Sequence, residues 1–353
     1  MWPIEKCFPH LHRMLRENPM AVVDAGCAGG IDPIFNDLAR QGYADNFGFE
    51  ASPKEYEKLA AMAKDPAVRM TIHNLALLDR DGTITFNACG TVGSVFARND
   101  RVALYRETYE ALEVPCATLD SLRANGTISR PIGVLKLDVE GSELAVLRGA
   151  RETMAREVLC VKAEMEFHAA RGTNNFAEIH LALGEAGFRL QGLAYNHSAI
   201  DGLHAGDALY LRRPEAVVAM PSLTNEEKRL WLLWLAAICL NLRQGEYLAV
   251  IARVGAGLFS PEEEAELRDL AVVHCFLPNV LPFAFPRLAH LVFVVAQFVA
   301  GKKHGTKSAP KVNRLVPLKP LFVQSHWQWL RRRHEQYLAR KVKAYMTRAD
   351  LKR

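Results

Sequence analysis

The sequence predicts an α/β domain with a mainly parallel sheet, followed by an all-helical C-terminal domain. Over residues 1–213, short apolar segments with strand character alternate with segments of helical periodicity, which is the pattern of βαβ units. From residue 214 onward we find no convincing strand, and helical patterns follow one another. We therefore expect two domains, residues 1–213 and residues 214–353, a division that 353 residues comfortably allow.

Composition narrows the class of protein further. The chain is 50% hydrophobic and 24% charged, which excludes a collagen-like, coiled-coil or wholly disordered protein. None of its seven cysteines has C-x-x-C spacing, which disfavours a structural zinc site or a disulfide framework and favours a reducing compartment. No uninterrupted apolar segment lies near the N-terminus, so we expect no signal peptide and a cytoplasmic location.

A short helix is expected to open the α/β domain, followed by a compact apolar strand over residues 20–25. A loop of small residues follows at residues 26–30. Apolar side chains at helical spacing then predict a helix that Gly42 ends.

A second strand is predicted over residues 46–50. The next helix is expected to begin at a capping box formed by Ser52 and Glu55, with a proline at the first helical position. A third strand lies at residues 70–72, and an Asp-Gly turn leads into a return strand at residues 84–86.

The second half of the domain repeats this alternation. In chain order, we expect a helix at 118–125, a strand at 133–140, a helix at 143–147, a strand at 158–166, a helix at 175–186, and two closing strands at 188–195 and 207–212. The two closing strands are predicted to form an antiparallel pair at the edge of the sheet.

The C-terminal domain is predicted to hold the helices 225–242, 245–256, 261–274, 287–300 and 325–348. Residues 288–300 are almost wholly apolar, but thirteen residues are too few to cross a membrane, which needs about 20. We therefore expect a buried helix there and no transmembrane helix, with an interfacial segment as the alternative.

Acidic residues fall near the C-terminal ends of four predicted parallel strands: Asp24, Glu50, Asp138 and Glu164 or Glu166. In an open parallel sheet these ends share one edge, and ligands bind there where the strand order reverses. Apolar strands have no structural need for four such carboxylates, so the sequence predicts a binding site at this edge.

The loop after the first strand indicates the kind of ligand. A dinucleotide fingerprint would place glycines at 26, 28 and 31, but this chain has Ala28 and Ile31. A carboxylate followed by a turn of small residues suits a ligand with a charged amino-acid end. Glu50 is placed to accept two ribose hydroxyls. Together these features predict S-adenosylmethionine as the cofactor.

Several segments resemble the FkbM family of S-adenosylmethionine-dependent methyltransferases: AVVDAGCAGG, GFEASP, NLALLDRDGTITF, the Gly93-Ser94 loop, and above all VLKLDVEGSELAVLRGAR. The resemblance covers about residues 18–213. It implies a class I methyltransferase fold, which is Rossmann-like, and methyl transfer to a hydroxyl oxygen. Acceptors in the family include sugars, glycolipids and polyketides.

The resemblance also assigns roles to individual residues. It places Asp24, Gly26 and Gly30 in the cofactor-binding motif, Glu50 at the ribose, and Asp138, Glu140 and Glu143 in the family's own motif. This chain has Cys27-Ala28 where the family usually has Ala-Asn, so one side-chain amide of the loop is lost.

Methyl transfer to a hydroxyl requires a group that removes the proton. Asp138 or Glu140 is our first candidate for this base, with a helix-capping role for Glu140 as the open alternative. His168 is the second candidate, and packing against a loop is its alternative. Lys136, inside a predicted strand, is expected to pair with an acid in a structural role.

A divalent metal is a further possibility at this edge. Asp138, Glu140, Glu164 and Glu166 offer oxygen ligands of the kind Mg²⁺ takes. Strand alternation sends neighbouring side chains to opposite faces, so only some of them are expected to converge. We predict no metal.

Charge is distributed unevenly along the chain. Residues 302–353 carry 15 Lys and Arg against 2 acidic residues, whereas the remainder has a net charge of −8. Residues 325–348 are predicted to form a basic amphipathic helix. We expect it to contact an anionic membrane surface or a lipid-linked glycan, which would make the protein peripheral at the cytoplasmic membrane face; the alternative is a docked helix with a solvated basic face.

The sequence thus predicts an O-methyltransferase that acts on a hydroxyl of a sugar, glycolipid or related metabolite. Two other hypotheses about the function stay open. One is a nucleic-acid methyltransferase whose basic tail holds phosphates, although no recognised nucleic-acid module accompanies the tail. The other is a non-catalytic adaptor that keeps the fold, which only the altered loop at Cys27-Ala28 favours.

Overall fold

The structure is a computed structural model that describes residues 8–64, 70–89, 91, 93–96, 109–167, 176–198 and 202–279. Contacts divide the chain into two compact units: Leu15–Leu235, and Met1–Met14 together with Ala236–Arg353. The first unit holds the sheets. The predicted division after residue 213 stays a prediction, because compactness does not show which segments fold on their own.

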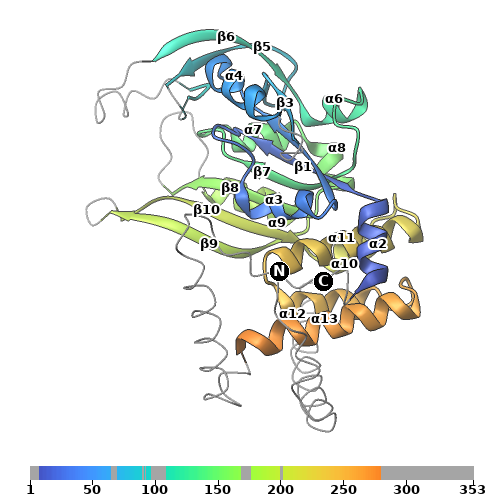
Figure 1. The fold of residues 1–353 in the computed structure, drawn as a ribbon. Helices are drawn as coiled ribbons and strands as arrows, with labels where there is room; N and C mark the ends of the chain where they lie inside the picture. The colour runs from blue at the N-terminus through green and yellow to red at the C-terminus, as the bar shows by residue number, and fades with distance from the viewer. Residues whose placement is uncertain are drawn as a thin grey trace, which may run out of the picture. The chain divides into compact units, whose positions relative to one another are not determined.

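The main sheet has seven strands in the order β3-β2-β1-β7-β8-β10-β9 (Figure 1). The strands are β1 Met20–Ala25, β2 Ala44–Phe49, β3 Met70–His73, β7 Ile132–Leu137, β8 Cys160–Glu166, β9 Phe188–Ser198 and β10 Gly202–Arg212. The first five pair in parallel, whereas β10 runs antiparallel to both β8 and β9. The predicted class, a mainly parallel Rossmann-like sheet with an antiparallel edge, is confirmed.

The strand order reverses between β1 and β7, whose chain neighbours leave in opposite directions along the sheet. Loops that follow β1 and β7 therefore diverge and leave a crevice at their carboxyl ends. This is the edge at which the strand-end carboxylates were predicted to gather.

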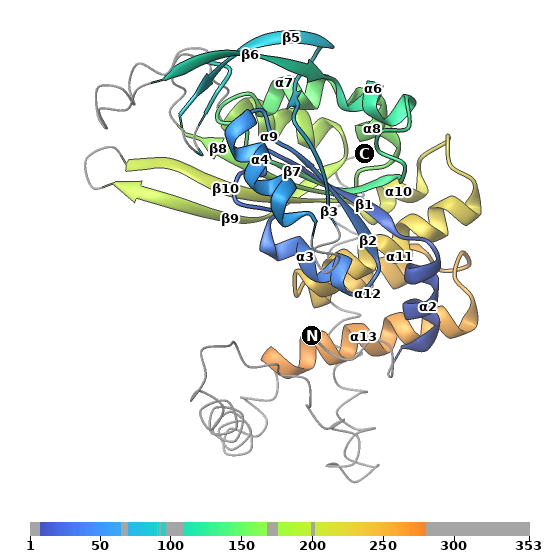
Figure 2. The same ribbon diagram turned by 45° about the horizontal axis from the view of Figure 1, so that its top comes forward.

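The β9–β10 hairpin is longer than predicted. Both strands have 11 residues, and the hairpin reaches beyond the ends of the neighbouring strands in both views (Figures 1 and 2). The added length lies on either side of the connecting turn, where the sequence NHSAIDGLHAG is too polar and glycine-rich to show strand character.

A second, three-stranded sheet was not predicted. It consists of β4 Ala76–Leu77, β6 Glu110–Ala117 and β5 Gly82–Ala88, in that order. The predicted return strand exists as β5, but it pairs antiparallel with β6 and not with the third strand. Strand β6 contains Pro115, which hides its strand character; at that position β6 pairs with β5 alone, because β4 joins only at Cys116 and Ala117.

Helices connect the strands of the main sheet: α3 Pro33–Arg40, α4 Pro53–Met62, α6 Leu119–Ala124, α7 Glu143–Arg148, α8 Arg151–Arg156 and α9 Phe176–Glu185. Two more follow the sheet, α10 Pro214–Val218 and α11 Asn225–Asn241. Half of the predicted capping box of α4 is present, since the Ser52 side chain accepts a hydrogen bond from the Glu55 N–H. The other half is replaced, because the Ser52 N–H donates to Glu50 and the Glu55 carboxylate pairs with Lys58.

One face of the main sheet packs against α6, α7, α8 and α9. The sheet contributes alternate residues such as Ala21, Val23 and Leu135, and the helices contribute residues such as Leu144 and Ile179. Because side chains alternate along a strand, Asp24 and its neighbours in register project to the opposite face.

Three of the predicted C-terminal helices are present as α11, α12 Gly245–Val254 and α13 Pro261–Asn279. The helices predicted at 287–300 and 325–348 lie outside the described residues. Among the helices that the structure does describe, none is both long enough and apolar enough to cross a membrane.

Helix α13 also contacts the first turn of α2, Pro9–Glu17. The Glu266 carboxylate accepts hydrogen bonds from the backbone N–H groups of His10, at 3.2 Å, and Leu11, at 2.8 Å. These residues belong to that first turn, so Glu266 provides the negative charge that a helix N-terminus favours.

Candidate functional site

A cavity of about 340 Å³ opens at the carboxyl ends of the parallel strands. Its polar wall includes the predicted residues Gly26, Glu50, Asp138 and Glu140, together with Glu164. Apolar side chains complete it: Phe49, Leu75, Leu77, Phe86, Val95 and Val139. Its size falls within the range of about 300–1,000 Å³ that small-molecule sites occupy.

Gly26 brings the first loop against the turn after β7. Its φ of +74° favours glycine, and a Cβ atom built there would lie 1.8 Å from the Asp138 carbonyl oxygen. The Gly26 N–H donates to the Phe49 carbonyl at 2.9 Å. Only glycine allows these three segments to approach so closely.

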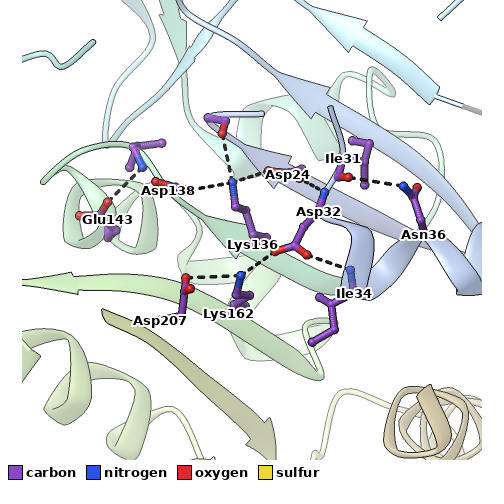
Figure 3. A network of polar contacts seen from close by, with 12 residues as sticks. Asp24, Ile31, Asp32, Ile34, Asn36, Lys136, Asp138, Glu143, Lys162 and Asp207 are labelled. Atoms are coloured by element: carbon purple, nitrogen blue, oxygen red, sulfur yellow. Dashed lines mark hydrogen bonds and ion pairs between the residues drawn. The ribbon is translucent and has the colours of Figure 1, made fainter. Parts of the chain in front are cut away.

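A row of charged side chains supports this loop from the face opposite the helices α6–α9. Asp24 of β1, Lys136 of β7 and Lys162 of β8 occupy matching positions on adjacent strands. Lys136 Nζ lies 3.0 Å from Asp24 Oδ1 and 3.2 Å from Asp138 Oδ2, and donates to the Gly26 carbonyl at 3.1 Å (Figure 3). Lys136 therefore holds both sides of the crevice, as a structural partner of acids.

The electrostatics of this row follow from its burial. Burial raises the pKa of Asp24 to about 6, and the nearby Lys136 ammonium opposes that rise. Burial alone would lower the pKa of Lys136, but Asp24 and Asp138 outweigh it and raise the pKa instead. Near neutral pH the row therefore contains a charged lysine between two carboxylates.

The row continues to the start of α3. The Asp32 N–H donates to Asp24 Oδ2 at 2.8 Å, and the Asp32 carboxylate pairs with Lys162 at 2.6 Å. Lys162 also lies 3.4 Å from Asp207 Oδ1 of β10 (Figure 3). Asp32 caps α3 by accepting from the Ile34 N–H, so the helix is tied to the sheet at its first turn.

Glu50 follows the last residue of β2 and is 5% exposed. Its Oε1 accepts a hydrogen bond from the Ser52 N–H at 2.8 Å, which fixes the carboxylate at the cavity wall. Burial raises the pKa of this carboxyl above its usual value. A ligand hydroxyl that donates to Glu50 would restore some of the solvation that burial removes.

The segment that follows β7 is a turn and not the end of a strand. Strand β7 stops at Leu137, and Glu140 has a φ of +53°, a left-handed conformation that is uncommon for a residue other than glycine. The Ser94 hydroxyl donates to the Glu140 carbonyl at 2.7 Å and holds this turn. The expectation that Glu140 closes the strand is therefore wrong.

Glu143, the first residue of α7, holds the turn that precedes this helix. Its carboxylate accepts hydrogen bonds from the N–H groups of Val139, at 3.0 Å, and Gly141, at 3.3 Å. Burial raises the pKa of Glu143 to about 7. Glu143 thus shapes the turn that carries Asp138 and Glu140.

Three carboxylates meet at the cavity. Oxygen atoms of Asp138, Glu140 and Glu164 all lie within 4.8 Å of one another. Asp138 and Glu140 come from the turn after β7, and Glu164 comes from the neighbouring strand β8. Burial and the neighbouring carboxylates, beginning with Asp138, raise the pKa of Glu164 to about 8.

The remaining predicted site residues lie elsewhere. Asp24 is fully buried beneath the loop, in the row that holds Lys136, and neither Asp24 nor Gly30 is among the residues that form the cavity wall. His168 lies outside the described residues. Asp24 thus supports the loop from below.

Sequence reasoning missed the part of the cavity that the second sheet supplies. Phe86 of β5 and the segment around Thr91, Gly93 and Val95 form one of its walls. The resemblance of the Gly93-Ser94 loop to a known family was the only signal that this segment belongs to the site.

Cys27 packs under the loop. It is 1% exposed, and a Cβ atom added to Gly48 would lie 2.8 Å from its sulfur atom. Burial, with Asp24 and Glu50 nearby, raises the pKa of the Cys27 thiol well above its usual value. Cys27 is therefore an unreactive packing residue in this conformation.

Comparison with known proteins matches part of the chain to a family. Residues 27–190 match the family model described as the methyltransferase FkbM domain. The search of curated proteins returned no match.

Solved structures of low sequence identity are also similar to the chain. Magnesium protoporphyrin IX methyltransferase from Synechocystis PCC 6803 is 12% identical, with 59% of this chain and 78% of that chain covered and a TM-score of 0.32. An rRNA methylase from Streptococcus thermophilus is 12% identical, with 58% and 96% covered and a TM-score of 0.31. A TehB-like methyltransferase from Corynebacterium glutamicum is 14% identical, with 57% and 86% covered and a TM-score of 0.28.

Proposed function

Because residues 27–190 match the model of the methyltransferase FkbM domain, the chain is a methyltransferase, and we propose that it transfers the methyl group of S-adenosylmethionine to a hydroxyl oxygen. The proposed acceptor is a sugar, a glycolipid or a related metabolite. The observation that carries the proposal is the cavity at the β1–β7 crevice, which places Gly26, Glu50 and the turn at Asp138 around one space.

The residues present fit the cofactor. The apolar wall formed by Phe49, Leu75 and Leu77 suits a purine ring. Glu50 offers a fixed carboxylate for ribose hydroxyls, and the Gly26 loop allows close approach of an amino-acid end. This set of donors and apolar contacts supports S-adenosylmethionine over a pyrophosphate-containing ligand.

S-adenosylmethionine, when bound, supplies an electrophilic methyl group. Asp138 and Glu140 lie beside the Gly26 loop, and we propose that one of them takes the proton of the acceptor hydroxyl. Lys136 orients Asp138 from below, and the Ser94 hydroxyl fixes the backbone that carries Glu140. The chain thereby holds a base at a defined position before an acceptor arrives.

The proposal is tested with methyl-labelled S-adenosylmethionine and a glycolipid extract. We expect the lipid fraction to become labelled, and the labelled methyl group to stay attached to the acceptor during alkaline hydrolysis. A methyl ether resists base, whereas a methyl ester does not. Asp138→Asn and Glu140→Gln should slow transfer at saturating cofactor by about 10²–10⁴-fold if the replaced group is the base. Unchanged transfer by both variants would shift the role to His168.

Two outcomes would overturn the acceptor class. Label that nuclease treatment releases would identify a nucleic-acid methyltransferase. Failure to bind S-adenosylmethionine in calorimetry would favour a non-catalytic adaptor.

We further propose that the basic C-terminal segment brings the enzyme to an anionic membrane surface or a lipid-linked acceptor. The support is the net charge of residues 302–353, to which each basic residue near such a surface contributes about 1 kcal/mol. The triple variant R331Q/R332Q/R333Q should bind anionic liposomes more weakly than the parent at low salt. Equal binding would make the segment a docked helix, and would leave the methyltransferase proposal untouched.

A further inference from the structure

We propose that Glu164, together with Asp138 and Glu140, makes the cavity select the positively charged sulfonium of S-adenosylmethionine over the neutral thioether of the demethylated product, S-adenosylhomocysteine. This inference rests on the proposed function. It assigns a role to Glu164, a side chain that the reaction as described above does not use.

The position of the sulfur follows from the connectivity of the cofactor. Its sulfur joins the amino-acid end to the ribose. With these parts at Gly26 and Glu50, the sulfur comes to the stretch of wall between them, where the Asp138 backbone touches Gly26. The carboxylates of Asp138, Glu140 and Glu164 form a single cluster at that wall.

The charge around Glu164 is one-sided. The four charged groups with the largest effect on it are all carboxylates: Asp138, Glu140, Glu143 and Asp207. They come from the turn after β7, from α7, and from the residue opposite Glu164 on β10. Two lysines on β7 and β8 already pair with other carboxylates, Lys136 with Asp24 and Asp138, and Lys162 with Asp32 and Asp207. On α9, which also packs against β8, the His180 ring contacts the Tyr210 hydroxyl.

A cation that enters this space relieves the repulsion among the carboxylates. The raised pKa of Glu164 means that a proton fills this role in the free protein near neutral pH. A bound sulfonium would displace that proton, whereas a thioether would not. Affinity for S-adenosylmethionine should therefore rise with pH up to about 8, and affinity for S-adenosylhomocysteine should change much less.

The test is calorimetry on the full chain with both compounds between about pH 6.5 and 8.5, with EDTA present. The parent should release protons when it binds S-adenosylmethionine and far fewer when it binds S-adenosylhomocysteine. Proton release is measured as the change in binding enthalpy between buffers of different ionisation enthalpy. Glu164→Gln should weaken binding of S-adenosylmethionine at the high end of this range by about tenfold. Its binding of S-adenosylhomocysteine should stay within about twofold.

The matched control is Glu166→Gln. Glu166 lies two residues further along β8 on the same face and is not among the residues that form the cavity wall. It should leave the ratio of the two affinities unchanged.

Equal losses for both compounds in Glu164→Gln, or no proton release by the parent, would overturn the inference and leave the proposed function standing. The proton-release measurement needs no variant, so misfolding of Glu164→Gln cannot hide the result. If the parent binds neither compound, the proposed function itself fails.

Discussion

At Gly26 the backbone needs two properties that only glycine combines. Its φ is positive, and the space where a Cβ would lie is filled by the Asp138 carbonyl. We expect Gly26→Ala to lower the free energy of unfolding by at least about 2 kcal/mol, measured by chemical denaturation.

Gly29 provides the matched control. It also has a positive φ, of +87°, but no atom lies within 4 Å of the site of an added Cβ. Gly29→Ala should cost about 1 kcal/mol, from the backbone conformation alone. If both variants lost the same stability, the clash between the added Cβ at position 26 and the Asp138 carbonyl would not contribute to the loss.

The affinity for S-adenosylmethionine should depend directly on the Glu50 carboxylate. Glu50→Ala removes a charged acceptor for two ribose hydroxyls, so we expect a loss of about 1–3 kcal/mol in the binding free energy of S-adenosylmethionine. Glu57→Ala, on the exposed side of α4, is the control for charge. Unchanged affinity in the Glu50 variant would place the ribose elsewhere.

Residue by residue, sequence reasoning found the cavity where it depended on the ends of parallel strands. Gly26, Glu50 and Asp138 meet there because parallel strands bring their carboxyl ends to one edge. It failed at Glu140, because the apolar alternation of VLKLDVE continues past the last residue of the strand. Alternation shows which residues are buried, but not where φ changes sign.

Among the elements, β10 ends in Arg212, whose side chain contacts four residues outside this strand. The Arg212 guanidinium donates to the carbonyls of Val158, at 2.6 Å, Ala186, at 3.2 Å, and Met154, and lies 4.4 Å from the centre of the Phe188 ring. Burial lowers the pKa of Arg212 to about 10, so it remains charged.

We expect Arg212→Met to lower the free energy of unfolding by about 2–3 kcal/mol, because it leaves buried carbonyls without a donor. The neighbouring variant Arg213→Met should cost much less, since the Arg213 guanidinium donates to the Gly187 carbonyl at 3.4 Å, an acceptor that the Arg213 backbone N–H also reaches. Thermal or denaturant unfolding compares the two. Equal losses would mean that the carbonyls find other partners.

The elements themselves were largely predictable, and the exceptions share a cause. The central strands β1 and β7 of the main sheet are fully buried and mostly apolar, so their sequence signal is strong. Half of the residues of β6, EALEVPCA, are exposed and the strand contains a proline, so it depends on its pairing with β5 for its conformation. A strand defined by its partner leaves a weak signal in its own sequence.

At the scale of the whole chain, Glu266 connects residues near the beginning with a helix more than 250 positions later. Glu266→Gln removes the charge at the first turn of α2 and should cost about 0.5–2 kcal/mol. Hydrogen exchange at the amides of His10 and Leu11 should become faster.

The control is Glu264→Gln, on the same helix, where the carboxylate pairs with Arg268. It should leave exchange at His10 and Leu11 unchanged. Exchange that is equally fast in both variants would mean that α2 is loosened through α13 as a whole. No sequence pattern predicts such a contact, because it joins segments that share no periodicity.

The buried thiol of Cys27 makes the opening of the first loop measurable as a labelling rate. A maleimide or disulfide reagent can reach that sulfur only when the loop lifts away from Gly48, so the rate of labelling counts openings. Peptide mass spectrometry separates this cysteine from the others. A ligand that binds against the loop should slow the labelling of Cys27 as its occupancy rises. Compounds can therefore be screened for binding in this way before the acceptor is known.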